Sequence, residues 1–321
     1  ASNLIGDNNT ALGYLALQDF VADTDGHGNN TAVGASAMMN ASTGTENTAL
    51  GNLAMAGGVT TGNSNVALGH GTGYNISSGQ DNTLVGTGTG DSITSGNRNT
   101  AVGFAALATE NAHGNNTAIG YAALNTLDAG ADGFNTAVGC ESGKAITTGI
   151  QNTIIGSLAG DALTTGAGNT AVGYQALTSE DAHGRNTAVG YNSLATLNAG
   201  SEGNNTAIGY KAGEGMTTGV QNTILGSLAG DALTTGQQNV LLGYFAGGGL
   251  VEGNFNTAIG TQALSVENAH SGNTAIGYQA LKVQDAGADA YNTAVGHTAG
   301  VAMTTAVQNT LIGAEVGDAL T

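Results

Sequence analysis

The chain has 321 residues with 23 acidic and 5 basic side chains, which gives a formal net charge of −18. So few cations, scattered as Arg98, Lys144, Arg185, Lys211 and Lys282, cannot neutralise a phosphate backbone, so the composition argues against nucleic-acid binding. Proline is absent, 55 residues are glycine and 4% are aromatic, which is unlike a globular core of this length, and no apolar run is long enough for membrane insertion.

A pentapeptide, Asn-Thr-Ala-(Val/Ile/Leu)-Gly, recurs with small variations along the whole chain. Its first residues, here called the marker asparagines, are Asn9, Asn30, Asn47, Asn65, Asn82, Asn99, Asn116, Asn135, Asn152, Asn169, Asn186, Asn205, Asn222, Asn239, Asn256, Asn273, Asn292 and Asn309. From Asn30 onward the step is 17 residues, apart from one step of 18 and three of 19. Such fixed-period repetition is typical of stacked repeat folds, with the extra residues in one loop per turn.

Fixed residue types at fixed distances from the marker indicate what each turn requires. The fourth residue after every marker is glycine, from Gly13 to Gly313, which predicts a backbone angle or a close approach that a Cβ would forbid. The Val, Ile or Leu before this glycine is expected to form a buried ladder. The marker itself is expected to hydrogen-bond along an asparagine ladder and to tolerate left-handed angles.

A second pattern concerns the eighth residue after the marker, which is Leu or Met in nine turns and glycine in the other nine. Each turn with glycine carries a large apolar residue three positions later, as in the pairs Gly90/Ile93 and Gly143/Ile146. An empty buried site costs about 2–5 kcal/mol for a Leu-sized group, and overfilling is also unfavourable. The exchange therefore predicts one cavity per turn, filled from either of two places.

These patterns predict an all-β fold, a parallel β-solenoid or β-roll of about 18 turns with a 17-residue period. Each turn is expected to hold two short strands joined by glycine-rich corners. The repetition predicts one continuous repeat domain over residues 1–321, interpreted as a fragment or processed segment of a longer fibre.

The unit Asn-Thr-Ala-Val-Gly-Tyr-Gln-Ala-Leu at 169–177, with its relatives throughout the chain, resembles the head repeats of trimeric autotransporter adhesins and the repeat shafts of phage tail fibres. The resemblance implies a left-handed β-roll assembled as a homotrimer. The period here is longer than in adhesin heads, and no heptad stalk, membrane anchor or chaperone domain is visible in the sequence.

A trimer also has a physical motive. Strand alternation puts Thr and Val of the pentapeptide on one face and Asn, Ala and Gly on the other. If one face fills the core, the other carries an apolar ladder that cannot be wholly solvated. Packing three chains together would bury it, at about 25 cal/mol per Å² of apolar surface.

Histidine and tyrosine supply two sets of candidate site residues. His27, His113, His183 and His270 each lie three residues before a marker, at least four turns apart, or roughly 19 Å at strand spacing. The sequence therefore excludes a metal site made of these histidines within one chain, and leaves loop capping or a ring around a threefold axis. The fifth residue after the marker forms an aromatic column, expected to serve packing, subunit contact or glycan binding: Tyr14, Phe104, Tyr121, Tyr174, Tyr191, Tyr210, Tyr244 and Tyr278.

Acidic loops are the third candidate, for calcium. Asp23-Thr24-Asp25-Gly26 resembles part of a calcium loop, and Asp128/Asp132 and Asp285/Asp289 lie in lengthened loops. The bidentate acid of a full calcium loop is missing, and ordinary turn chemistry explains Asp and Gly equally well. The metal assignment is therefore left open, with calcium as the candidate, and no other cofactor is expected.

The sequence favours a structural function. No nucleophile elbow or phosphate loop is present, and equivalent residues in every turn are the opposite of a unique active site, so no catalytic residue is predicted and the chain is not expected to be an enzyme. Cys140 is the single cysteine and forms no disulfide framework. We expect a fibre or adhesin-like segment outside a cell or on a virion, with a host surface protein or glycan as partner. Alternatives are a subunit of a filament that polymerises end to end, an ice-binding solenoid that uses Thr columns such as Thr10, Thr31 and Thr48, and a calcium-binding solenoid that uses the acidic loops.

Overall fold

Every marker asparagine is followed directly by a three-residue β-strand in the computed structural model. The structure describes residues 8–20, 28–180, 182–266, 268–287, 289–318 and 320, and none of these residues is helical. It comprises two compact units, residues 1–165 and 166–321. The predicted all-β class is therefore confirmed for the described residues, while one continuous domain over 1–321 stays a prediction.

Among its described residues, each unit has nine strands. In the first unit they are β1 (Thr10–Leu12), β2 (Thr31–Val33), β3 (Thr48–Leu50), β4 (Val66–Leu68), β5 (Thr83–Val85), β6 (Thr100–Val102), β7 (Thr117–Ile119), β8 (Thr136–Val138) and β9 (Thr153–Ile155). In the second unit they are β10 (Thr170–Val172), β11 (Thr187–Val189), β12 (Thr206–Ile208), β13 (Thr223–Leu225), β14 (Val240–Leu242), β15 (Thr257–Ile259), β16 (Thr274–Ile276), β17 (Thr293–Val295) and β18 (Thr310–Ile312).

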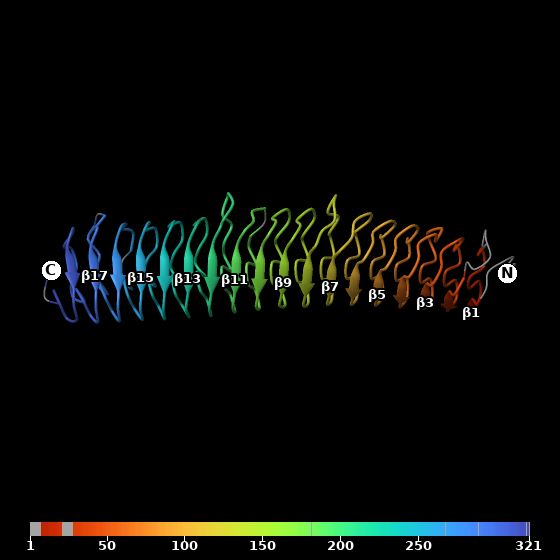
Figure 1. Cartoon of the computed structure of the whole chain (residues 1–321), viewed down its shortest axis with the longest axis horizontal. Helices are drawn as coiled ribbons and strands as arrows, with labels where there is room; N and C mark the ends of the chain where they lie inside the picture. Colours follow the sequence, from red (N-terminus) through yellow and green to blue (C-terminus); the bar gives the residue numbers. More distant parts are fainter. Residues whose placement is uncertain are drawn as a thin grey trace. The chain divides into compact units, whose positions relative to one another are not determined.

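Within each unit, every strand pairs in parallel with the next strand along the chain (Figure 1). The register places equivalent residues opposite each other, as in Ala101↔Ala118 and Thr117↔Thr136. A parallel β-solenoid with one repeat per turn is therefore confirmed for each unit. The handedness and the trimeric assembly taken from the family resemblance stay predictions.

The expectation of two strands per turn is wrong, because the described residues of each turn form one strand and the rest of the turn is built differently. Residues with left-handed backbone angles recur before the marker and at the sixth and eighth positions after it. Arg98, Ala105 and Leu107 have φ values of 56°, 52° and 50°. Their N–H groups donate to the carbonyls of Gln80, Thr87 and Ala123 in adjacent turns, at 2.9–3.0 Å. These hydrogen bonds offset left-handed strain of roughly 1–2 kcal/mol per non-glycine residue.

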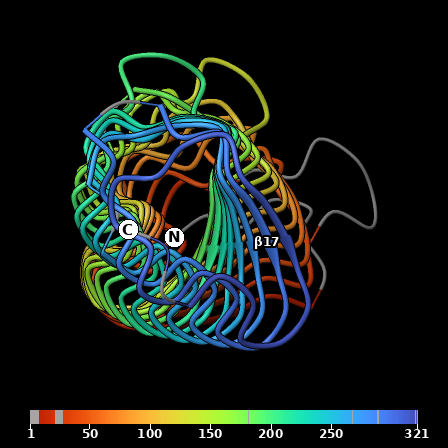
Figure 2. The same cartoon turned by 90° about the vertical axis from the view of Figure 1, so that its left-hand side faces the viewer.

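Lengthened turns place their extra residues in exposed loops, as the repeat spacing predicts. In the first unit the 19-residue turn exposes Asp128, Gly130 and Asp132, and in the second the equivalent loop exposes Asn198 and Glu202. These loops, yellow and green in Figure 2, extend beyond the neighbouring turns of their own units.

The glycine at the fourth position is required for both predicted reasons. Gly103 has a φ of 136°, and a Cβ added there would lie 2.3 Å from the carbonyl oxygen of Gly120 in the next turn. Gly120 repeats this relation with Gly139 at 2.2 Å, at a φ of 141°. A side chain at this column would therefore push successive turns apart.

The buried ladder of each sheet is alanine, and the expectation that the aliphatic residue before the glycine is buried is wrong. Ala101, Ala118 and Ala137 are fully buried at the middle of their strands. Ile119 is 39% exposed and Leu50 43% exposed. Alternation in a three-residue strand directs the first and third side chains outward once the second faces the core.

The exchange between the eighth and eleventh positions is confirmed as a packing relation. Leu107 and Leu124 are fully buried at the eighth position, and Ile93 and Ile146 are fully buried at the eleventh. A Cβ added to Gly90 or Gly143 would lie 2.9 Å from the Cδ1 of the isoleucine three residues later. One side chain excludes the other.

A further compensation in the core is evident in the sequence once the structure locates the cavity. In five turns a large residue replaces the buried strand alanine, and every one of these turns has glycine at its eighth position: Leu84, Ile154, Ile224, Leu241 and Leu311. A Cβ on Gly160 would contact the Cδ1 of Ile154 at 3.2 Å, and one on Gly230 would lie 2.7 Å from the Cδ1 of Leu241. The glycines therefore also make room for side chains of the strand and of adjacent turns.

The marker asparagines form the predicted ladder and are almost all buried. Asn82 donates its backbone N–H and its side-chain Nδ2 to Oδ1 of Asn65 at 3.1 and 3.0 Å, and the same Nδ2 donates to the carbonyl of Gly96 at 2.8 Å. The expectation that the marker takes left-handed angles is wrong, because the left-handed residue is the one before it, as in Asp81 with a φ of 58°.

The fourth-position glycine can be tested with Gly103→Ala. We expect a loss of more than about 3 kcal/mol in the free energy of unfolding, since the strained φ alone costs roughly 1–3 kcal/mol and the Cβ also displaces a carbonyl. The control is Gly88→Ala. Gly88 has a φ of 62°, and no atom lies within 4 Å of a Cβ added there, so this variant should lose only about 1–2 kcal/mol in the free energy of unfolding. Urea unfolding followed by circular dichroism measures both, and equal losses would contradict the close-approach argument.

The shared cavity can be tested with a double-mutant cycle at Gly143 and Ile146. Ile146→Ala should cost about 2–5 kcal/mol because it empties the site, and Gly143→Leu alone should overfill it. The combined variant should be more stable than either single variant, since it reproduces the stacking of Leu107 and Leu124 in the preceding turns. Additive losses in urea unfolding would show that the two positions do not share a cavity.

Candidate functional site

The outward side chains of the strands form apolar columns on the surface of each unit. In the first unit Leu50, Leu68, Ile119 and Ile155 are 39–43% exposed, and in the second Ile208, Leu225 and Leu242 are 37–42% exposed. The parallel register places them one above the other. These columns therefore differ from isolated exposed apolar residues, which are normal on a protein surface.

All residues of the predicted aromatic column are exposed, and those in consecutive turns are stacked. Phe104 and Tyr121 in the first unit have ring centroids 5.5 Å apart, and Tyr174, Tyr191 and Tyr210 in the second form two successive stacks at the same distance. Interplanar angles of 10–16° make these near-parallel stacks. Each ring follows the outward aliphatic residue of its strand by two positions, so the two columns lie close together in every such turn. We call these two columns together the apolar face.

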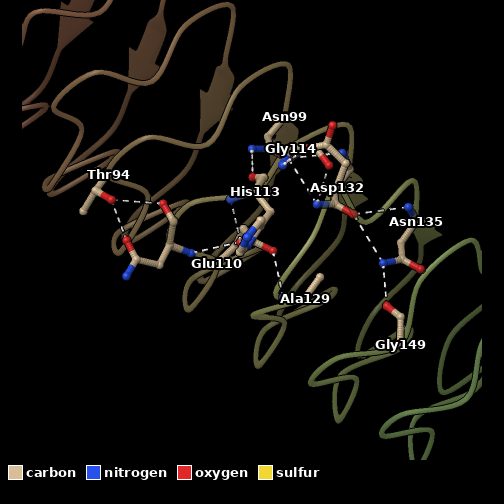
Figure 3. A network of polar contacts seen from close by, with 11 residues as sticks. Thr94, Asn99, Glu110, His113, Gly114, Ala129, Asp132, Asn135 and Gly149 are labelled. Atoms are coloured by element: carbon tan, nitrogen blue, oxygen red, sulfur yellow. Dashed lines mark hydrogen bonds and ion pairs between the residues drawn. The ribbon is translucent and has the colours of Figure 1, made fainter.

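The loop histidines take part in loop capping. In the first unit His113 donates its backbone N–H to Oε1 of Glu110 at 3.1 Å, and its carbonyl accepts Nδ2 of Asn99 at 3.1 Å (Figure 3). The second unit repeats this with Glu180 and His183 at 3.1 Å. His270 instead has its Nδ1 3.6 Å from Oδ1 of Asp285, and His27 lies outside the described residues.

The acidic residues proposed for calcium divide into two groups. Asp132 accepts the N–H of Gly114 at 3.1 Å and Asp289 accepts that of Ser271 at 3.0 Å, so each stabilises the loop of the preceding turn. Asp128 and Asp285 instead lie near histidines of the preceding turn. The loop at Asp23 and Asp25 lies outside the described residues.

One cluster in the described part of the chain has the composition of a metal site. Ligand atoms of Glu110, His113 and Asp128 all lie within 4.8 Å of one another. The distances between the histidines exclude a site made of histidines alone. They do not exclude a site in which one histidine, His113, lies beside carboxylates from two turns. The signal in the sequence was Glu110 three residues before His113 and an aspartate in the lengthened loop of the next turn.

Burial perturbs several carboxyl groups. Desolvation raises the pKa of Asp91, and raises that of Glu110 against the opposing effect of the N–H groups of His113 and Ala129. Desolvation is also the main cause of the raised pKa of Asp231, to which the nearby Glu214 carboxylate adds. Oδ1 of Asp231 is buried without a hydrogen-bond partner. Asp91, Glu110 and Asp231 belong to three different turns.

No protein-family model, curated protein or solved structure matches this chain. The family resemblance noted from the repeats therefore stays a prediction. Within the described ranges, no helix is long and apolar enough to cross a membrane.

The raised pKa of Asp231 predicts how stability depends on pH. The pKa of Asp231 in the folded chain lies above its unfolded value near 3.8, so between these two pKa values the native state binds more protons than the unfolded state. The stability that this proton contributes is present at low pH and is lost as pH rises through the folded pKa. Asp231→Asn should therefore be more stable than the wild type at neutral pH, with the difference shrinking below pH about 4. Urea unfolding of both chains between pH 3 and 8 measures it, and a difference independent of pH would contradict the burial argument.

Proposed function

We propose that this chain is a structural, self-associating fibre segment whose apolar face packs against other copies, in a homotrimer. The observation that carries the proposal is the repetition of that face, since equivalent exposed aliphatic and aromatic residues recur along both units. An interface that adds a similar contact in every turn gains affinity in proportion to length, as repeat surfaces do.

Burial explains why association would be favourable. At about 25 cal/mol per Å² of apolar surface, covering one half-exposed Ile or Leu contributes a few tenths of a kcal/mol to about 1 kcal/mol. Summed over the nine turns of one unit, this is enough to compete with the cost of association. The formal charge of −18 limits nonspecific aggregation, so the apolar face would pair selectively.

The same features support a location outside a cell or on a virion, in a fibre that projects or forms an attachment surface. The resemblance of the repeats to adhesin heads and tail-fibre shafts supports that setting, and end-to-end polymerisation is the alternative form of self-association. A purely structural role, without catalysis, fits the equivalence of the turns.

Glycan binding is a second candidate, favoured by the stacked rings of Tyr174, Tyr191 and Tyr210. These three residues are 43–49% exposed, and the exposed parts of aromatic rings can contact sugar rings. A host glycan would then be the partner of the attachment surface. Glycan-array binding that Tyr191→Ala abolishes would favour this role over subunit contact.

Native mass spectrometry of the wild type and Ile119→Lys tests the main proposal. We expect a mass of three chains for the wild type and dissociation toward monomer for the variant, because a charge is then buried in the middle of the apolar face. The control is Thr148→Lys, at an exposed loop position that should leave the trimer intact. Unchanged circular dichroism would show that both variants fold. A monomeric wild type at micromolar concentration would overturn the proposal.

A further inference from the structure

In the first unit, a cluster outside the apolar face joins two successive turns. Glu110 and His113 belong to one turn, and Asp128 comes from the lengthened loop of the next (Figure 3 shows the Glu110–His113 part). We propose that Glu110, His113 and Asp128 bind one divalent transition-metal ion, with Zn²⁺ as the best-fitting ion, and so link the two turns.

The imidazole of His113 provides the observation that points to a ligand. Its Nδ1 is buried and has no hydrogen-bond partner, although the Glu110 carboxylate is close. Nδ1 lies 3.4 Å from Oε1 of Glu110, and the two atoms do not form a hydrogen bond. Two ligands on one tetrahedral Zn²⁺, each about 2.0–2.1 Å from the metal, are separated by about 3.3–3.4 Å. The spacing therefore suits a shared ion.

Glu110 is held in position by the backbone. Its Oε1 accepts the N–H groups of Asn111 and His113 at 3.1 Å, and its Oε2 accepts that of Ala129 at 3.4 Å. Its side chain is fully buried, so it has little freedom to turn away. Hydrogen bonds of this kind orient metal-binding carboxylates, and a carboxylate oxygen has lone pairs to spare for a cation.

Asp128 supplies the third ligand and the charge. It is exposed, and its backbone is fixed by the hydrogen bond from its N–H to the carbonyl of Thr147 at 2.8 Å. Its carboxylate is close enough to oppose ionisation of Glu110, so the cluster combines two acids with one imidazole. A divalent cation removes this repulsion. The imidazole favours zinc over calcium, which prefers oxygen ligands.

The chain contains its own comparison for the third ligand. In the second unit Nδ1 of His183 lies 3.3 Å from Oε1 of Glu180, and it too is buried without a hydrogen-bond partner. Asn198 occupies the position of Asp128, and its N–H donates to Thr217 as that of Asp128 donates to Thr147. The Glu–His pair alone therefore caps the loop at His183, and the aspartate distinguishes the His113 turn from that copy.

The test is Zn²⁺ titration of the full chain by calorimetry at pH 7.5, with Co²⁺ absorption as a probe of geometry. His270 and Asp285 are also in contact and could bind Zn²⁺ in every variant. The number of Zn²⁺ sites in each variant is therefore compared with the number in the wild type. Asp128→Asn, which reproduces the natural Asn198, and His113→Gln should each remove one site or weaken it more than about ten-fold. Asn198→Asp should add one site in the second unit.

Ser95→Asn serves as the matched control, since it changes a half-buried loop residue of the first unit outside the cluster and should leave Zn²⁺ binding unchanged. Circular dichroism verifies that every variant folds. Wild-type stoichiometry and affinity in both Asp128→Asn and His113→Gln would overturn the proposal. An Asn198→Asp chain that gains no site would overturn the role of the third carboxylate.

Discussion

The asparagine ladder is the constraint on which the rest of each unit depends. Marker side chains take no part in the strand ladder, yet the most fully bonded of them connect three places: the marker before, the marker after and a loop carbonyl 14 residues on. Asn135 does this with Asn116, Asn152 and Gly149. Every turn is held to its neighbours at this one column. The other columns therefore keep the same register, and the alanines, glycines and stacked rings repeat with the same spacing. Loss of one such side chain would leave several buried polar groups unsatisfied, at about 1–3 kcal/mol each.

The sequence alone was sufficient to predict those features that steric exclusion or packing requires at one position of every turn. A glycine in every turn could only reflect backbone constraint, and the exchange of Gly143/Ile146 with Leu124 could only reflect a common cavity. The inward direction of the strand was less accessible, because a three-residue strand offers either one or two side chains to the core. Val102 is the larger residue and for that reason was expected in the core, but the smaller Ala101 is the one that is buried. The left-handed backbone at Leu107 has no compositional signal, since inter-turn hydrogen bonds alone make it acceptable.

The loop sites show a different limit. Periodicity places His113 and His183 at equivalent positions, and it correctly separates them by several turns. It gives no information on which side chains of the next turn approach them, because that depends on the path of a lengthened loop. Asp128 and Asp132 are four residues apart in one such loop, yet one approaches the Glu110–His113 pair while the other hydrogen-bonds to the backbone of Gly114. Only the folded loop distinguishes them.

Repetition and departure from repetition therefore support the two proposals in different ways. The outward aliphatic residue, which recurs in every turn, presents a surface that grows with length, and the proposed association would use this surface. A loop residue that differs between otherwise equivalent turns, such as Asp128 and Asn198, changes one turn without disturbing the columns, since it contributes nothing to the buried ladders. The proposed metal site can therefore differ from turn to turn in the loops, while the strands keep the repetition on which the proposed assembly depends.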